Sequence, residues 1–226
     1  MQYSKIVGGN GQRHERDFYP TPIECTQALL NFLKEKNVKI NKVWECACGE
    51  LHMSNIIEQN GIDVISTDIL TGTDFITAEV PDNNIDWIIT NPPFNVAEKF
   101  IERAFSLNLP FAFLLKSQFW HSKKRYPLFE KTKPSYVLPL TWRPDFTGQG
   151  SSLLDMAWVV WGLNTKETIY QPLQKPTNSE QLNYYKQLSC PKCGGILSEI
   201  REHNNKEYRH CYGCHFEFFI GDKINE

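Results

Sequence analysis

The segment Asn91-Pro92-Pro93-Phe94 combines residue types that could bind an amino group on a flat ring. It follows a hydrophobic run, residues 85–90, that has the character of a buried strand. The two prolines have no N–H, so the backbone carbonyls beside them lack a ladder partner. Asn91 adds an amide acceptor, and Phe94 adds an apolar ring face. These groups suit a planar ring with an exocyclic amino group, whereas a simple proline turn would require neither Asn91 nor Phe94.

The elements that must position this segment alternate between strand-like and helix-like patterns. Helical patterns cover residues 21–36, 54–60 and 96–107, and strand patterns cover 42–46, 63–67, 86–90, 111–115, 136–140 and 156–161. This alternation predicts an α/β fold with a mostly parallel sheet and helices on both faces. We expect the last two strands to run antiparallel, because residues 141–155 between them lack a helical pattern. In such a sheet, ligands bind at the carboxyl ends of the strands.

Two other predicted strands also end in residues that could bind a ligand. The first is followed by Glu45-Cys46-Ala47-Cys48-Gly49-Glu50, where small residues and a glycine allow a ligand to approach the backbone near a helix N-terminus. Asp68 closes the second strand about twenty residues later, where it could accept both hydroxyls of a ribose or cap the next turn. Asp74-Phe75 could bind an adenine amino group and ring face, although Phe75 could equally belong to the core.

Four of the seven cysteines have the spacing of a metal site. They form two Cys-X-X-Cys pairs: Cys190, Cys193, Cys211 and Cys214. Glycines beside both pairs allow the backbone to turn tightly, and the spacing is typical of a zinc ribbon with four thiolate ligands. Four thiolates leave no open coordination position, so we expect this Zn²⁺ to be structural.

A basic stretch runs from Lys116 to Arg143 and contains seven Lys and Arg residues against one acid, Glu130. The aromatic residues Phe119, Trp120 and Tyr126 lie among these cations. The stretch could follow a phosphate backbone, or it could be an ordinary solvated helix face around residues 123–131. The candidate nucleic-acid contacts are Lys116, Lys123, Lys124, Arg125 and Arg143.

Length and composition favour a folded protein with one main domain and a small appendage. The chain has 226 residues, a hydrophobic fraction of 41% and a net charge of -2. Its longest apolar stretch, near residues 109–115, is too short to cross a bilayer, and the N-terminus lacks the apolar core of a signal peptide. We therefore expect a cytoplasmic protein without membrane association. The predicted organisation is a main domain over residues 1–162, a linker over 163–186 and the zinc ribbon over 187–226.

The order of these features resembles that of class I S-adenosylmethionine-dependent methyltransferases that modify adenine N6 in DNA, especially the small solitary enzymes of phages and prophages. The matching segments are Asp17–Pro22, Glu45–Glu50, Asp68, Asp74-Phe75, Asn91–Phe94 and Asp155–Trp161. Their order is similar to the gamma arrangement of that family. The resemblance covers about residues 15–162. It implies a Rossmann-like seven-stranded methyltransferase sheet, S-adenosylmethionine as cofactor, and DNA as partner in a bacterial or phage-infected cell.

The resemblance also implies a catalytic role for Asn91, Pro92, Pro93 and Phe94. Phe94 would stack on a target base that has swung out of its own stack. The amide oxygen of Asn91 and the carbonyl of Pro92 would accept the two amino hydrogens. The motif is specific for methylation of an amino nitrogen, but it does not identify the polymer that carries this nitrogen.

The cofactor site implied by the resemblance draws on three strand ends and on the segment before the first helix. Its residues are Tyr19, Pro20, Thr21, Glu45, Cys48, Gly49, Asp68, Ile69, Asp74, Phe75 and Asn91. In the family pattern, Glu45 and Gly49 correspond to the methionine end of the cofactor and Asp68 to the ribose. The Asp74-Phe75 pair corresponds to the adenine, and Tyr19–Thr21 to the opposite wall.

Two positions depart from the family pattern. Cys46 replaces a proline that usually follows the first acid of the cofactor loop, and Leu51 replaces a second glycine, where a side chain could crowd the methionine end. Two alternatives to a DNA methyltransferase stay open, the first because the motif does not identify the polymer and the second because of Leu51. One is an RNA adenine-N6 methyltransferase, and the other is a catalytically silent nucleic-acid-binding subunit. A protein-glutamine methyltransferase is less favoured, because that group typically has Tyr in place of Phe94.

Overall fold

The computed structural model describes residues 20–146 and 154–176, together with the backbone of three strands near the C-terminus. The chain divides into two compact units, Met1–Lys175 and Pro176–Glu226. Within the described residues, none of the helices has the length and apolar character that crossing a membrane requires. The first unit contains every described residue of the predicted catalytic and cofactor sites.

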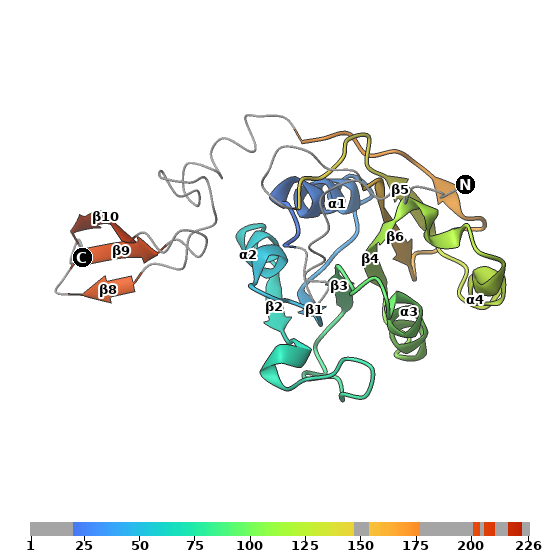
Figure 1. Cartoon of the computed structure of the whole chain (residues 1–226), viewed down its shortest axis with the longest axis horizontal. Coiled ribbons are helices and arrows are strands. Elements are labelled where there is room, and N and C mark those ends of the chain that lie inside the picture. Colours follow the sequence, from blue (N-terminus) through green and yellow to red (C-terminus); the bar gives the residue numbers. More distant parts are fainter. Residues whose placement is uncertain (1–19, 147–153, 177–200, 204–205, 211–216, 223–226) are drawn as a thin grey trace, which may run out of the picture. The chain divides into compact units, whose positions relative to one another are not determined.

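The first unit alternates helices and strands (Figure 1). Its α-helices are α1 (Ile23–Glu35), α2 (His52–Gln59), α3 (Ala97–Ser106) and α4 (Tyr126–Lys131), and its 3₁₀ turns are η1 (Ile69–Thr71), η2 (Ser117–Trp120) and η3 (Lys123–Arg125). Its strands are β1 (Lys42–Glu45), β2 (Asp63–Ser66), β3 (Trp87–Thr90), β4 (Phe111–Lys116), β5 (Tyr136–Pro139), β6 (Met156–Trp161) and β7 (Ile169–Tyr170). Each predicted helix and strand is present, with bounds that differ by one or two residues.

The seven strands form one mixed sheet in the order β2-β1-β3-β4-β6-β5-β7. Strands β2, β1, β3 and β4 run parallel, and β6 runs antiparallel to both β4 and β5. The prediction of an α/β fold with an antiparallel last pair is therefore confirmed. Strand β7 pairs with β5 and lies in the segment that was predicted as a linker, so the sheet extends past residue 162.

Helices cover both faces of this sheet. On one face, α3 contributes Ala97, Phe100 and Ile101 to a cluster with aromatic residues of β4 and β6. On the other face, the indole Nε1 of Trp158 in β6 donates a hydrogen bond of 2.8 Å to the carbonyl of Cys25 in α1. The strands β3, β4 and β6 are nearly continuous hydrophobic runs, as expected for strands that are buried from both sides.

The second unit contains a three-stranded antiparallel sheet in the order β10-β9-β8. Its strands are β8 (Arg201–His203), β9 (Lys206–His210) and β10 (Glu217–Asp222). The four predicted zinc ligands, Cys190, Cys193, Cys211 and Cys214, lie outside the described residues. Tyr19 and the rest of residues 1–19 also lie outside them, so both the zinc site and the role of Tyr19 stay predictions.

Candidate active site at the carboxyl ends of β1, β2 and β3

The Asn91 motif leaves the sheet beside the predicted cofactor loop. Strands β1 and β3 are parallel neighbours, with Trp44 in register with Ile88. Glu45 at the end of β1 and Asn91 after the end of β3 therefore lie at the same edge of the sheet. This is the edge where ligands bind in open α/β sheets.

Asn91 contacts the segment that precedes α1, which is 70 residues away in the chain. Its Nδ2 donates a hydrogen bond of 3.1 Å to the hydroxyl oxygen of Thr21, and Thr21 is buried. The carbonyl of Pro93 accepts a hydrogen bond of 3.1 Å from the N–H of Val96, which begins the turn into α3. These two contacts hold the motif between α1 and α3.

Phe94 is half-buried, and one face of its ring is next to a cation. The ammonium nitrogen of Lys116, the last residue of β4, lies 4.1 Å from the centre of the Phe94 ring. The backbone of Lys116 is paired with Met156 of β6, so the cation extends from a well-anchored strand end. An ammonium at this distance forms a cation–π contact, which holds the Phe94 side chain in place.

Glu45 is a buried carboxyl group that belongs to a small polar network. It is only 2% exposed, and it accepts a hydrogen bond from the hydroxyl of Ser54 in α2. The Ser54 hydroxyl also lies 2.6 Å from the hydroxyl of Ser66 at the end of β2. Burial raises the pKa of Glu45 to about 8, and the nearby charges of Asp68 and Glu58 add to this effect. The two serines were not recognised from the sequence, because no spacing rule connects them with Glu45.

Asp68 joins the ends of β1 and β2. One of its carboxylate oxygens accepts a hydrogen bond of 2.9 Å from the N–H of Gly49, and the other accepts one of 2.8 Å from the N–H of Leu70. Gly49 has a φ of 50°, a conformation that glycine adopts without steric cost. Asp68 therefore both caps the η1 turn and fixes the cofactor loop, and a carboxylate can accept further hydrogen bonds from a ribose.

The remaining described residues of the predicted cofactor site differ in exposure. Ile69 is exposed beside Asp68, whereas Phe75 is a core residue that is 1% exposed and packs edge-on against Trp44. Asp74 accepts a hydrogen bond of 3.0 Å from the N–H of Ile76 within its own turn. Cys48 is buried in the loop, and burial raises the pKa of its thiol to about 12, so the thiol is neutral. Phe75 could contact the adenine or belong to the core, and its burial agrees with a core residue.

Leu51 starts α2 in a conformation that is unusual for leucine. Its φ of 64° and ψ of 18° lie in the left-handed region, where a side chain costs about 1 kcal/mol or more. Its side chain is 39% exposed rather than buried in the core. Glycine adopts this left-handed conformation without steric cost, so the backbone geometry agrees with the glycine that the family pattern has at this position.

We expect the substitution Leu51→Gly to tighten the binding of S-adenosylmethionine. Overpacking a site typically costs about 1–3 kcal/mol, so removal of the side chain should improve affinity by about fivefold or more in calorimetric titration. Asn37→Gly is a matched control, because Asn37 also has a left-handed backbone, with φ 56°, but lies at the end of α1. Equal affinity of Leu51→Gly and the unchanged chain would show that Leu51 does not crowd the cofactor.

Of the five predicted nucleic-acid contacts, Lys116 lies over the Phe94 ring, and the other four fall into two groups. Lys123 and Lys124 are exposed, whereas Arg125 and Arg143 form ion pairs. Arg125 Nε lies 2.7 Å from Glu98, and Arg143 Nε lies 2.9 Å from Asp155. Arg125 therefore has a structural partner within the fold, which its sequence position did not indicate.

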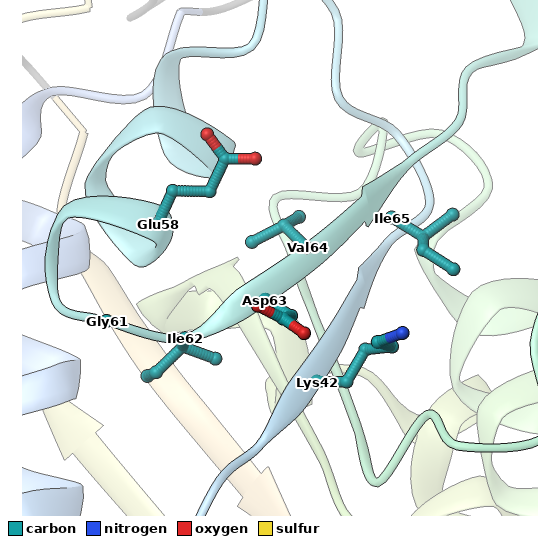
Figure 2. Close-up of a pocket in the computed structure, with 7 residues that line it drawn as sticks. All are labelled: Lys42, Glu58, Gly61, Ile62, Asp63, Val64 and Ile65. Atoms are coloured by element: carbon teal, nitrogen blue, oxygen red, sulfur yellow. The ribbon is translucent and has the colours of Figure 1, made fainter.

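A hollow of about 470 Å³ lies at the opposite end of β1 and β2 (Figure 2). Its lining residues come from these two strands, from the end of α2 and from the loop between α2 and β2: Lys42, Glu58, Gly61, Ile62, Asp63, Val64 and Ile65. Lys42, the first residue of β1, forms an ion pair of 2.9 Å with Asp82. Because the hollow is at the amino ends of the strands, it is separate from the candidate active site.

Comparisons with known proteins bear on the fold. No protein-family model and no curated protein matches this chain. Among solved structures, the chain is similar to a candidate class I S-adenosylmethionine-dependent methyltransferase from Listeria monocytogenes, with a TM-score of 0.51 and 14% identity; the match covers 78% of this chain and 72% of that chain. Another similar structure is a candidate RNA methyltransferase from Pyrococcus horikoshii, with a TM-score of 0.49, 13% identity and coverage of 71% and 94%. With this sheet order and helices on both faces, the chain has the α/β fold of the class I S-adenosylmethionine-dependent methyltransferases.

Proposed function

We propose that this protein transfers a methyl group from S-adenosylmethionine to the exocyclic N6 nitrogen of adenine in DNA. The observation that carries the proposal is the position of Asn91-Pro92-Pro93-Phe94. The motif follows β3, whose neighbour β1 ends in the Glu45–Gly49 loop, and Asn91 contacts Thr21 across the site. An amino-group acceptor, an aromatic ring and a candidate cofactor loop thus share one edge of the sheet.

The residues around Asp68 fit S-adenosylmethionine. Asp68 presents a carboxylate at the end of β2 for the ribose. Asp68 also accepts a hydrogen bond from the N–H of Gly49, and the loop that this bond fixes would hold the methionine end of the cofactor. Exposed Ile69 offers an apolar surface for the adenine ring. The bound cofactor supplies a methyl group that is activated by a positively charged sulfur. Asp74, Cys48 and the Tyr19–Thr21 segment complete the proposed site, and the buried Phe75 would support it from the core.

The residues of the motif would prepare the target amino group for attack. The amide oxygen of Asn91 and the carbonyl of Pro92 accept its two hydrogens, which directs the nitrogen lone pair toward the methyl group. Phe94 holds the ring of the base, a contact worth about 1–3 kcal/mol for aromatic stacking on a base. No strong base would be required, because the methylated nitrogen carries a positive charge and readily loses its proton to water after the new bond has formed. Positioning of the two reactants would provide most of the rate.

Nucleoside analysis tests the proposed function directly. The purified protein is incubated with S-adenosylmethionine and either DNA or RNA, and each polymer is then digested to nucleosides. The expected result is N6-methyl-2′-deoxyadenosine from the DNA sample and no N6-methyladenosine from the RNA sample. Product from RNA only would favour the RNA adenine methyltransferase, whose amino-group chemistry is the same. No product and no calorimetric signal with S-adenosylmethionine would favour the catalytically silent subunit, which the side chain of Leu51 supports.

We further propose that the C-terminal unit binds structural Zn²⁺ through Cys190, Cys193, Cys211 and Cys214. Elemental analysis should find about one zinc per chain, because two Cys-X-X-Cys pairs supply the four thiolates of a closed site. Cys190→Ser should lose the metal, whereas Cys25→Ser in the buried core of the first unit should keep it. A full zinc content in Cys190→Ser would contradict the assignment.

The zinc unit could recognise the nucleic acid or only stabilise the chain. Deletion of residues 187–226 separates these roles. Weaker nucleic-acid binding with an unchanged melting temperature of the first unit would support recognition. Unchanged nucleic-acid binding with a lower melting temperature would support a stabilising role.

A further inference from the structure

Two exposed lysines and an exposed tyrosine lie together on the segment that follows β4. Lys123 and Lys124 belong to η3, and Tyr126 is the first residue of α4. Tyr126 is 65% exposed, which is high for a large aromatic residue. We call these three residues the η3–α4 tip.

Phe119 and Trp120, which precede the tip in the basic stretch, are packed within the fold. Phe119 is buried, and Trp120 packs against Phe129 and Trp161, with ring centres 5.2 Å and 6.4 Å away. Both rings are part of the packing that supports the tip. Of Phe119, Trp120 and Tyr126, Tyr126 is therefore the one that is exposed.

Arg125 anchors the tip to the helix that follows the Asn91 motif. Its Nε donates a hydrogen bond of 2.7 Å to Glu98, and its Nη1 donates one of 2.8 Å to the carbonyl of Phe119. Its guanidinium group also lies 4.4 Å from the centre of the Phe119 ring. Glu98 is in the first turn of α3, four residues after Phe94. The tip is thus tied to the first turn of α3, which directly follows the Asn91 motif.

The chemistry of the tip matches a polynucleotide strand. Two neighbouring ammonium groups can contact phosphates, and an exposed aromatic ring can stack on a base of any identity. A base inside an intact duplex has both faces covered by its neighbours. A base next to a nucleotide that has swung out has one face uncovered, so a stacked tyrosine could replace the missing neighbour.

We propose that Lys123, Lys124 and Tyr126 bind the nucleotides that flank the target adenine, with the lysines at phosphates and the Tyr126 ring on an uncovered base. This inference rests on the proposed function, because it takes the Asn91 motif as the position of the target. It also identifies the preferred substrate as a single strand or a locally opened duplex.

Fluorescence anisotropy with a labelled, adenine-containing single-stranded DNA tests the proposal in the full-length protein. Tyr126→Ala should weaken binding by about tenfold, and Tyr126→Phe should bind like the unchanged chain, because stacking requires the ring and not the hydroxyl. The double variant Lys123→Gln/Lys124→Gln should reduce the slope of log affinity against log salt by about 1.4, which corresponds to two lost phosphate contacts. Lys34→Gln/Lys39→Gln is the matched control, since both of these lysines are exposed at the far end of α1.

Two results would overturn the proposal: unchanged binding by Tyr126→Ala, or an equal loss of binding in the control pair. Circular dichroism of each variant verifies that it is folded. Nucleoside analysis separates this proposal from the proposed function. If the chain methylates no adenine but Tyr126→Ala still loses single-strand binding, the tip assignment holds and the proposed function fails. If adenine is methylated but the tip variants bind as before, the tip assignment alone fails.

Discussion

The substitution Asn91→Ala is expected to reduce methyl transfer to adenine by about 10²–10³-fold, as removal of one positioned hydrogen-bonding group does in other active sites. The reason is that the alanine variant loses the acceptor that orients the amino nitrogen. Binding of S-adenosylmethionine should change little, because Asp68, Gly49 and Glu45 are held by contacts that do not involve Asn91. The measurement is the rate of methyl incorporation, with cofactor affinity measured in parallel by calorimetry.

Asn95→Ala is the matched control for this prediction. Asn95 is exposed and follows Phe94 directly, so its replacement removes the same side chain without changing the proposed acceptor. The control should retain nearly full activity. If Asn91→Ala also turned over at the original rate, the assignment of the motif to catalysis would be wrong.

The affinity for S-adenosylmethionine is expected to rise with pH up to about 8, the pKa to which burial raises Glu45. Below this value the Glu45 carboxyl is protonated and neutral. The cofactor carries positive charge, so binding favours the ionised carboxylate and releases a proton. A single linked proton changes affinity by at most about tenfold per pH unit. The affinity should therefore rise steeply between pH 6 and 8 and should level off above that range.

Calorimetry in buffers of different ionisation enthalpy measures this proton release directly. Glu45→Gln should bind with an affinity that depends little on pH, because its side chain cannot ionise. Glu50→Gln is the control, since Glu50 lies in the same loop but is exposed. The other acids near Glu45 are Asp68 and Glu58, and both raise its pKa. A pH dependence that survives in Glu45→Gln would assign the proton to another group.

The same carboxyl group should make the protein less stable as the pH rises. Its pKa is raised from 4.5 to about 8 in the folded state, so between these values the folded chain binds a proton that the unfolded chain does not. The free energy of unfolding should therefore fall by up to about 1.4 kcal/mol per pH unit across this window. A carboxylate whose pKa is lowered by an ion pair has the opposite effect. Urea unfolding of the original chain and of Glu45→Gln at pH 5, 6.5 and 8 would measure the difference.

The sequence alone determined the order of the elements and the location of the motif. Hydrophobic periodicity specifies helices and strands locally, and the strands from β1 to β6 were predicted within one or two residues. The position of Asn91 at a strand end also follows from local sequence, because the hydrophobic run stops where the Asn-Pro-Pro segment begins. The short strand β7 was missed, since two residues cannot show a periodic pattern.

Only the tertiary structure decided which residues meet at the sheet edge. The contact of Asn91 with Thr21, the cation of Lys116 above Phe94, and the serines around Glu45 all join segments that no local pattern connects. These contacts depend on the order and register of the strands, which set distances between residues far apart in the chain. For the same reason, the exposed lysines of the η3–α4 tip could be distinguished from the anchoring Arg125 only when the partners of each side chain were known.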